Sequence, residues 1–511
     1  MASLAGGLIV SANDVKRSYR HVTLGNGLDV LLVSDPETEK SSACCDVRVG
    51  SLQDPVEAPG LAHFLEHMLF MGTDKYPVEN AYSSFLNEHG GSSNAYTAME
   101  NTVYYFDVLS DSLGPALDMF SSFFICPLFA PDSTDREINA VDSENSKNLQ
   151  NDSWRFFQLF KSMAREEHPF NGFSTGNKAT LGREGLATRD LCVAFHQKYY
   201  SANLMKVCIY GKEDLDTLEA WATEKFLPIA NKSVERPVVP ADPFPPARVG
   251  RVVESVPIKE YKGLSLFFPI PPVETLYRCV CPPSVLLFPS PISSILLFLP
   301  PSSLLFPPLA CLFPFFHHHC TCTLSPCPTR SKPSSYLGHL IGHEGGGSIL
   351  SALKAAGLAN GLSAYTTHDT SSFAAFCVSV DLTDRGVESV NAVVAAVFAY
   401  IGVLKREGPQ DWIAQEMQDT RAMDFRFLNA SDPIDYTVYL ANNMQTMQPE
   451  HYVAGEKLLI DKDPALSASF LDCLRPDNLL LFVRHKVPVI PLLPSLCISM
   501  TAVLCKLRTH T

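Results

Sequence analysis

Three residues in the stretch GLAHFLEHMLFMGT (60–73) have the types and spacing to hold and use a metal ion: His63, Glu66 and His67. Residues 63 and 67 are four apart, so on a helix both imidazoles project from one face, which suits two nitrogen ligands at about 2.0–2.1 Å from one Zn²⁺. Glu66 could reach a water molecule on that ion, in the reverse of the H-E-x-x-H order. The alternative is an ordinary helix with two surface histidines.

A catalytic zinc site built on two histidines needs a third protein ligand, commonly a carboxylate, with water in the fourth position. The stretch DREINAVDSENSKNLQNDSW (135–154) offers Glu137 and Glu144. These glutamates are seven residues apart and so share one face of a helix. Their spacing does not decide which of them would bind the ion, and a solvated acidic helix face is the alternative.

Several helices and strands must position these residues. Runs rich in β-branched, aromatic and aliphatic residues predict strands over 27–35, 43–52, 101–110, 263–270 and 372–382. Helical periodicity predicts helices over 57–71, 78–89, 113–125, 133–165, 348–357 and 388–406. For the long helix over 133–165, Thr134 and Glu137 have the spacing of a capping box at its start.

The order of these elements predicts an α+β protein with two similar α/β modules, each a mixed or antiparallel sheet packed with helices. The first module, 1–235, would hold the metal residues, and a Pro-rich linker over 236–262 would lead to the second module, 263–486.

Two segments do not fit this plan. Residues 279–330 contain no Asp, Glu, Lys, Gly, Asn or Gln, and proline recurs every few positions. Repeated prolines exclude both a membrane helix and a soluble core strand. Because Pro, Leu, Ser and Phe share pyrimidine-rich codons, we interpret 279–332 as an unspliced intron carried into the protein sequence. The tail, 487–511, has a milder form of the same composition.

Composition narrows the class of protein. The net charge of −14 argues against a nucleic-acid-binding surface. The 15 cysteines are scattered over a long chain whose first residues are a poor match to a secretory or transit signal, and we therefore expect reduced thiols. We therefore expect no nucleic-acid or membrane partner and a cytoplasmic location, with peroxisome and mitochondrion as alternatives.

Several ordered motifs resemble the insulin-degrading branch of the pitrilysin-type (inverzincin) metallopeptidases. They are GLAHFLEHMLFMGTDKYP, HGGSSNAYTAMENTVYYFDV, REINAVDSE, DSW, HPFNGFSTGN and YLGHLIGHEG. The resemblance implies half of a two-part clamshell that encloses a chamber. It further implies an endopeptidase that cleaves peptides and small unfolded proteins with one Zn²⁺ per chain. By position, His63, His67 and Glu144 would bind zinc, Glu66 would be the general base, and Glu137 would orient a ligand.

The stretch GGSSNAYTAMENTVYYFDV begins at a Gly-Gly pair and continues as a strand, whose edge could pair with an extended peptide. An internal strand paired on both sides is the alternative. The resemblance favours the substrate edge, with Asn94, Ala95 and Tyr96 beside the cleaved bond. It also implies an exosite for the substrate N-terminus, made of Gly338, His339, Gly342, Glu344 and Leu362. Ala364 and Ser335 depart from the family pattern there. His339 and His343 lack a nearby third ligand, which argues against a second metal.

The resembling enzymes are roughly twice this length, and their second half closes the chamber. We therefore expect the chain to need that C-terminal half, or a second subunit, for activity. Two other interpretations stay open: a short-subunit relative similar to a processing peptidase, and a non-catalytic subunit of the same fold.

Overall fold

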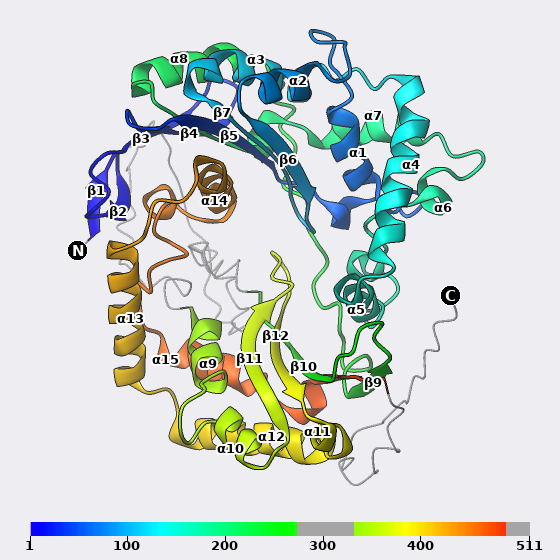
Figure 1. The fold of residues 1–511 in the computed structure, drawn as a ribbon, viewed down its shortest axis with the longest axis vertical. Helices are drawn as coiled ribbons and strands as arrows, with labels where there is room; N and C mark the ends of the chain where they lie inside the picture. The colour runs from blue at the N-terminus through cyan, green and yellow to red at the C-terminus, as the bar shows by residue number, and fades with distance from the viewer. Residues whose placement is uncertain (1, 273–331, 487–511) are drawn as a thin grey trace, which may run out of the picture.

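The computed structural model describes residues 2–272 and 332–486, which form two sheets with helices packed against them (Figure 1). The first sheet has six strands, in the order β3 (Ser18–Thr23), β4 (Asp29–Ser34), β8 (Met205–Gly211), β5 (Lys40–Val47), β7 (Thr102–Leu109) and β6 (Ser92–Thr97). The second has five, in the order β11 (Ala359–Thr367), β12 (Ala374–Leu382), β10 (Gly263–Ile270), β13 (Leu480–Arg484) and β9 (Arg251–Ser255). Each sheet contains one parallel strand pair, β4–β8 in the first sheet and β13–β9 in the second, and its other strand pairs are antiparallel. The predicted α+β class is confirmed.

A short hairpin of β1 (Ala2–Ala5) and β2 (Leu8–Ser11) precedes the first sheet. The helices of the first half are α1 (Leu61–Leu69), α2 (Ala81–Glu88), α3 (Leu113–Ile125), α4 (Pro131–Asn148), α5 (Asp152–Lys161), α6 (Lys178–Leu181), α7 (Thr188–Tyr199) and α8 (Leu215–Phe226). Those of the second are α9 (Pro333–Ile341), α10 (Ile349–Ala355), α11 (Asp384–Glu388), α12 (Val390–Glu407), α13 (Asp411–Arg426), α14 (Pro433–Thr446) and α15 (Pro464–Asp472). No helix in 2–272 or 332–486 is long and apolar enough to cross a membrane.

The central strands are buried on both faces. In β4, Val30 and Leu32 join the core beneath α1, α3 and α8, while Leu31 and Val33 join a separate core with α14. All four side chains have no exposed surface. Two-sided burial explains why this strand reads as an unbroken apolar run rather than as an alternating one.

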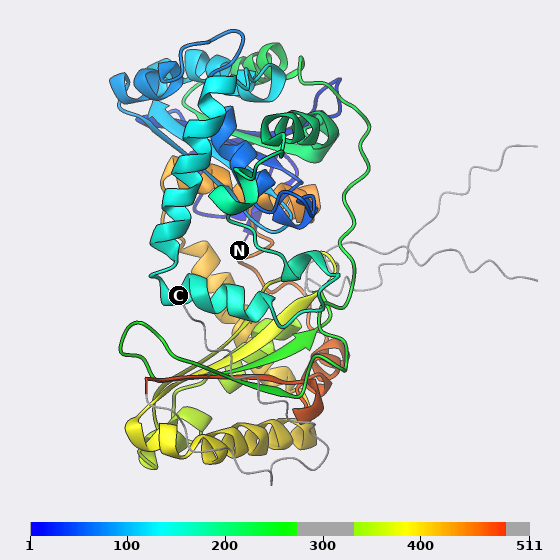
Figure 2. The same cartoon turned by 90° about the vertical axis from the view of Figure 1, so that its right-hand side faces the viewer.

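Each half also contributes a helix to the other half's sheet. From the second half, α14 packs on β5 and β8 of the first sheet. From the first half, α5 lies across the second sheet (Figure 2), where Phe160 stacks near Phe267, with ring centroids 4.6 Å apart. The two halves therefore pack against each other through both sheets.

The structure corrects the predicted helix over 133–165. The chain forms two helices there, because the side chain of Asn151 accepts hydrogen bonds from the backbone of Ser153 and Trp154 and so starts α5 as a new helix. The predicted capping box is wrong: α4 begins at Pro131, and Thr134 lies inside its first turn, bonded back to the Ala130 carbonyl.

Two further boundaries differ from the prediction. The strand predicted over 43–52 is β5, which ends at Val47, and Ser51–Gln53 form a 3-10 helix. Within the predicted linker 236–262, Arg251–Ser255 form β9, the edge strand of the second sheet. The interpretations of 279–332, apart from Lys332, and of the tail 487–511 lie outside the described residues.

Candidate metal centre

The helix α1 carries three of the predicted site residues, and its start is fixed by a partly buried acid. Both carboxylate oxygens of Asp54 accept backbone hydrogen bonds, one from Gly60 N at 2.7 Å and one from Ala62 N at 2.8 Å. These bonds satisfy two of the donors that a helix start leaves free. Gly60 itself has φ +91°, a left-handed conformation that favours glycine.

The two helices α1 and α4 bring His63, His67 and Glu144 together. The Oε2 atom of Glu144 lies 3.6 Å from Nε2 of His63 and 3.7 Å from Nε2 of His67. One ligand atom from each of the three residues lies within 4.8 Å of the others. Tetrahedral ligands at zinc bond lengths are about 3.3 Å apart, so a small adjustment would let all three bind one ion.

The second nitrogen of each imidazole is already bonded. Nδ1 of His63 lies 2.7 Å from the carbonyl oxygen of Thr175, and Nδ1 of His67 lies 3.1 Å from Oε2 of Glu137. Because each acceptor takes an Nδ1–H, each imidazole in its neutral form would present the Nε2 lone pair to a metal ion. The donor set therefore fits a zinc ion. Glu144 faces the position of that ion, whereas Glu137 lies on the far side of His67.

Charges within the cluster shift the pKa values of its residues. Burial lowers the pKa of His67, but the neighbouring carboxylates of Glu137 and Glu144 outweigh it and raise that pKa to about 9. The imidazole of His67, with the nearby His63, lowers the pKa of Glu144. Without an ion, the protonated imidazole balances the carboxylate charge. A divalent cation would supply that positive charge instead.

Glu66 lies beside the three ligand candidates and is held separately. Its side chain is buried, with 7% exposed, and its Oε2 accepts a hydrogen bond of 2.6 Å from Oγ1 of Thr97 on β6. Burial raises the pKa of this carboxyl group. The carboxylate thus lies at a wall of the site, between α1 and the edge strand, with an environment that favours taking up a proton.

A cavity of about 730 Å³ opens over the cluster. Its wall includes all five predicted metal and catalytic residues and the three predicted strand residues, together with apolar side chains from α5 and from the residues that follow α1. These apolar residues are Phe70, Met71, Trp154 and Phe157. The cavity therefore joins a charged floor to an apolar side.

The predicted strand is an edge strand. β6 pairs with β7 and is the last strand of the first sheet, so its outer side has no strand partner in the described chain. The Ala95 N–H is bonded to the Asn94 side chain at 2.9 Å rather than to β7, and so points to the outer side. Tyr96 is tied back to the second half through a 2.8 Å hydrogen bond from Asn442.

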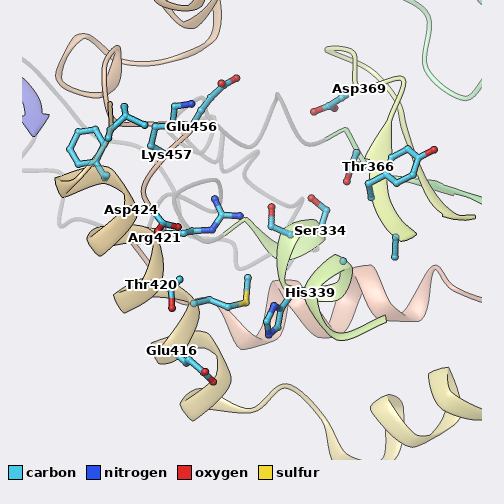
Figure 3. Close-up of a pocket in the computed structure, with 17 residues that line it drawn as sticks. Ser334, His339, Thr366, Asp369, Glu416, Thr420, Arg421, Asp424, Glu456 and Lys457 are labelled. Carbon is cyan, nitrogen blue, oxygen red and sulfur yellow. The ribbon is translucent and has the colours of Figure 1, made fainter. Parts of the chain in front are cut away.

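The five predicted exosite residues are only partly assembled. Gly338 and His339 line a cavity of about 770 Å³ between α9, β11 and α13 (Figure 3). Gly342 and Glu344 lie outside its lining, and Leu362 is 7% exposed and belongs to the second core.

The two glycines have a packing role. A Cβ on Gly338 would lie 2.9 Å from the Ala364 carbonyl oxygen, and one on Gly342 would lie 3.3 Å from Ala364 N. Glycine at both positions therefore lets α9 approach β11 closely. Within the described residues, His339 and His343 belong to no three-residue metal cluster.

Three contributors to the site escaped the sequence analysis. Thr175 acts through its backbone carbonyl, so no residue type could reveal it. Thr97 is an ordinary strand threonine until β6 is folded beside α1. Asp54 could have been found, because an Asp-Pro pair shortly before a glycine-started helix is a turn signal.

Known protein families match most of this chain. A family model described as insulinase, peptidase family M16, matches residues 29–167. The M16 inactive domain matches 187–281 and 317–420, and the middle or third domain of M16 matches 425–490. Residues 282–316, inside the segment interpreted as an intron, are matched by none of these three models.

Individual relatives also match most of this chain. Human insulin-degrading enzyme is 41% identical over 485 residues, which cover 94% of this chain and 42% of that protein. The A-factor-processing enzyme of Saccharomyces cerevisiae is 41% identical over 91% of this chain and 40% of its own. The crystal structure of pitrilysin superposes with a TM-score of 0.81 at 29% identity, covering 93% of this chain and 46% of that one. The chain therefore spans less than half the length of these proteins.

Proposed function

The chain belongs to the insulinase family of peptidases, M16, and on that basis we propose that it is the zinc-binding half of an endopeptidase. The observation that carries the proposal is the cluster of His63, His67 and Glu144, in which the Nδ1 atoms of both imidazoles are bonded elsewhere and their Nε2 atoms face Glu144. Two histidines and one carboxylate are a known catalytic zinc set.

The chain's own residues would divide the chemistry. A bound Zn²⁺ supplies water activation and polarisation of the peptide carbonyl. Glu66 takes the proton of the attacking water and passes it to the leaving amine. Thr97 holds one oxygen of that carboxylate, which leaves the other free for the proton. Glu137 keeps His67 in the tautomer that presents Nε2.

The substrate would be an extended peptide bound along β6. The outward backbone of Ala95 would pair with it as an added strand, with Asn94 and Tyr96 beside the cleaved bond, which gives affinity with loose sequence preference. The apolar wall of the cavity would accept an apolar side chain next to the cleaved bond. Gly338 and His339, which line the second cavity, would help to anchor the substrate N-terminus, and Glu344 would pair with its α-amino group.

Turnover would require a second half. The relatives are more than twice as long as their matched portion, and a half-open cavity exposes the reacting groups to bulk water. The partner would be the C-terminal half of the clamshell or a second subunit, and the location would be the cytoplasm. The complete ligand set counts against a non-catalytic role.

The deciding experiment measures zinc content and hydrolysis of a fluorogenic peptide by the full chain, with and without a co-expressed second half. We expect about one zinc per chain, and turnover only with the second half. Chelator-treated protein, before and after zinc is restored, is the control. A folded chain without zinc would refute the proposal, and zinc without hydrolysis in the completed clamshell would favour the non-catalytic alternative.

A further inference from the structure

Lys161 is a buried cation that the proposed chemistry does not use. It is the last residue of α5 and is 2% exposed. Its Nζ donates a 2.9 Å hydrogen bond to Oγ of Ser174 and lies 5.1 Å from the ring centroid of Phe157 and 6.0 Å from that of Phe170. Burying an ammonium group costs free energy unless hydrogen bonds or an opposite charge compensate it, so groups near Lys161 must offset this cost.

The field of Asp54, the acid at the start of α1, favours the charged form of Lys161. Burial lowers the pKa of Lys161 to about 8, and the field of Asp54 opposes that shift. In return, burial raises the pKa of Asp54 to about 7, and Lys161 opposes it together with the backbone donors at Gly60 and Ala62. Each group therefore helps to keep the other charged in a poorly solvated position.

Each member of this pair holds one segment of the metal site. Asp54 binds the backbone at the start of α1, the helix that carries His63. Lys161 binds Ser174, and the next residue, Thr175, provides the carbonyl oxygen 2.7 Å from Nδ1 of His63. A short path thus leads from the ammonium group, through one serine and one peptide unit, to the imidazole.

The two segments are also in backbone contact. A Cβ on Gly60 would lie 2.2 Å from the Cα of Gly176, so the chain after Thr175 rests directly on the first residue before α1. No flexible side chain lies between the two backbones at this contact to take up a displacement. If Ser174 lost its hydrogen bond to Lys161, the shift would therefore change the position of the Thr175 carbonyl relative to His63.

We propose that Lys161 is a positioning residue for the metal centre: by anchoring Ser174 it fixes the Thr175 carbonyl that orients His63 and keeps its Nε2 as the ligand atom. The inference rests on the proposed zinc function and extends it beyond the ligands and their direct partners. Because α5 packs on the second sheet, the same contact makes the geometry of His63 depend on the docking of the two halves.

The residue type matters for this role. A methionine would fill the same apolar space between Phe157 and Phe170 but could not donate to Ser174. An arginine could donate and keep the charge, although its planar guanidinium needs more room. The pair of variants Lys161→Met and Lys161→Arg therefore separates volume from hydrogen bonding and charge.

The test is zinc affinity of the full chain, measured by competition with a chromogenic chelator, with thermal unfolding of the zinc-free proteins alongside. For Lys161→Met we expect about tenfold weaker binding, since loss of groups that orient a ligand costs about 10–100-fold in affinity. Lys161→Arg should recover most of it. The visible absorption of the Co²⁺-loaded chain should change in Lys161→Met, because it reports ligand geometry.

Lys225→Met is the matched control, since the side chain of Lys225 is only 10% exposed and lies 3.8 Å from Asp118 on α3, away from the metal residues. It should bind zinc like the wild type. If Lys161→Met does not fold, Ser174→Ala removes the same hydrogen bond and should also weaken binding several-fold.

Wild-type zinc affinity and an unchanged Co²⁺ spectrum in Lys161→Met would overturn the inference while leaving the proposed function intact. Equal loss of affinity in both lysine variants, in parallel with lower melting temperatures, would overturn it as well. A wild-type chain that binds no zinc would refute the proposed function itself, and the inference with it.

Discussion

His67 lies between two glutamates of one helix: its Nδ1 is 3.1 Å from Glu137, and its Nε2 is 3.7 Å from Glu144. The two residues that sequence spacing could not distinguish therefore have different positions. Only Glu144 also reaches His63, at 3.6 Å. We predict that Glu144→Ala loses zinc almost completely, whereas Glu137→Ala weakens zinc binding by about 10–100-fold. Chelator competition measures both, and equal losses would contradict the assignment.

Glu66 should separate metal binding from turnover. Its oxygens contact Thr97 and the open cavity rather than completing the ligand set, so Glu66→Gln should keep zinc at the wild-type level. The amide cannot accept the proton of the attacking water, and we expect peptide hydrolysis in the completed clamshell to fall by at least about 10²-fold. His67→Ala, as the comparison, should lose both zinc and activity. Undiminished hydrolysis by Glu66→Gln would remove Glu66 from its proposed role.

The outer edge of β6 can be tested through one backbone donor. The Ala95 N–H points away from β7, so Ala95→Pro removes a donor from the substrate side without breaking the β6–β7 ladder. We expect KM for a peptide to rise about tenfold in the completed clamshell, with zinc content unchanged. Ala95→Ser keeps the N–H and is the control. An unchanged KM in the proline variant would place the substrate elsewhere.

The sequence predicted local features well where one segment carries the whole signal. The strand predicted over 101–110 is β7, Thr102–Leu109, and the helix predicted over 113–125 has the bounds of α3. His63, Glu66 and His67 share α1 for the same reason, because their spacing is a property of one helix. The edge position of β6 was one of two alternatives that the sequence left open.

Long-range contacts could not be predicted in this way. The distinction between Glu137 and Glu144 depends on the angle at which α4 crosses α1, which no spacing along α4 encodes. The exchange of α5 and α14 between the two sheets depends on packing of segments far apart in sequence. Leu362 was assigned to an exosite by position, although its side chain lies in the second core.

The contact between Gly60 and Gly176 predicts a large cost for one added methyl group. Gly60→Ala combines a left-handed φ of +91° with a Cβ placed 2.2 Å from Gly176, so we expect it to lower the free energy of unfolding by more than about 3 kcal/mol. Gly185→Ala is the control, since φ is +81° there but nothing lies within 4 Å. It should cost only about 1–2 kcal/mol. Urea unfolding measures both, and similar losses would show that the close contact does not limit the fold.

His368 makes the docking of the two halves sensitive to acid. Its ring stacks on Phe160 at 4.7 Å and on Phe157 at 5.3 Å, which joins the second half to α5. Burial lowers its pKa from 6.5 to about 4, so below pH 6.5 the unfolded chain binds a proton that the folded chain does not. Its contribution to stability is therefore complete above pH 6.5 and is lost as the pH falls towards 4, by about 1–2 kcal/mol at pH 5.

The variant His368→Asn tests this dependence, because asparagine tolerates the residue's φ of +52° and does not titrate. Loss of the ring stacking should lower stability at every pH, so the informative quantity is the difference between pH 7.5 and pH 5 in urea unfolding. We expect that difference to shrink by about 1–2 kcal/mol in the variant. His196, whose pKa burial lowers to about 3, still contributes to the remaining slope. An unchanged difference would mean that His368 stays accessible to protons in the folded protein.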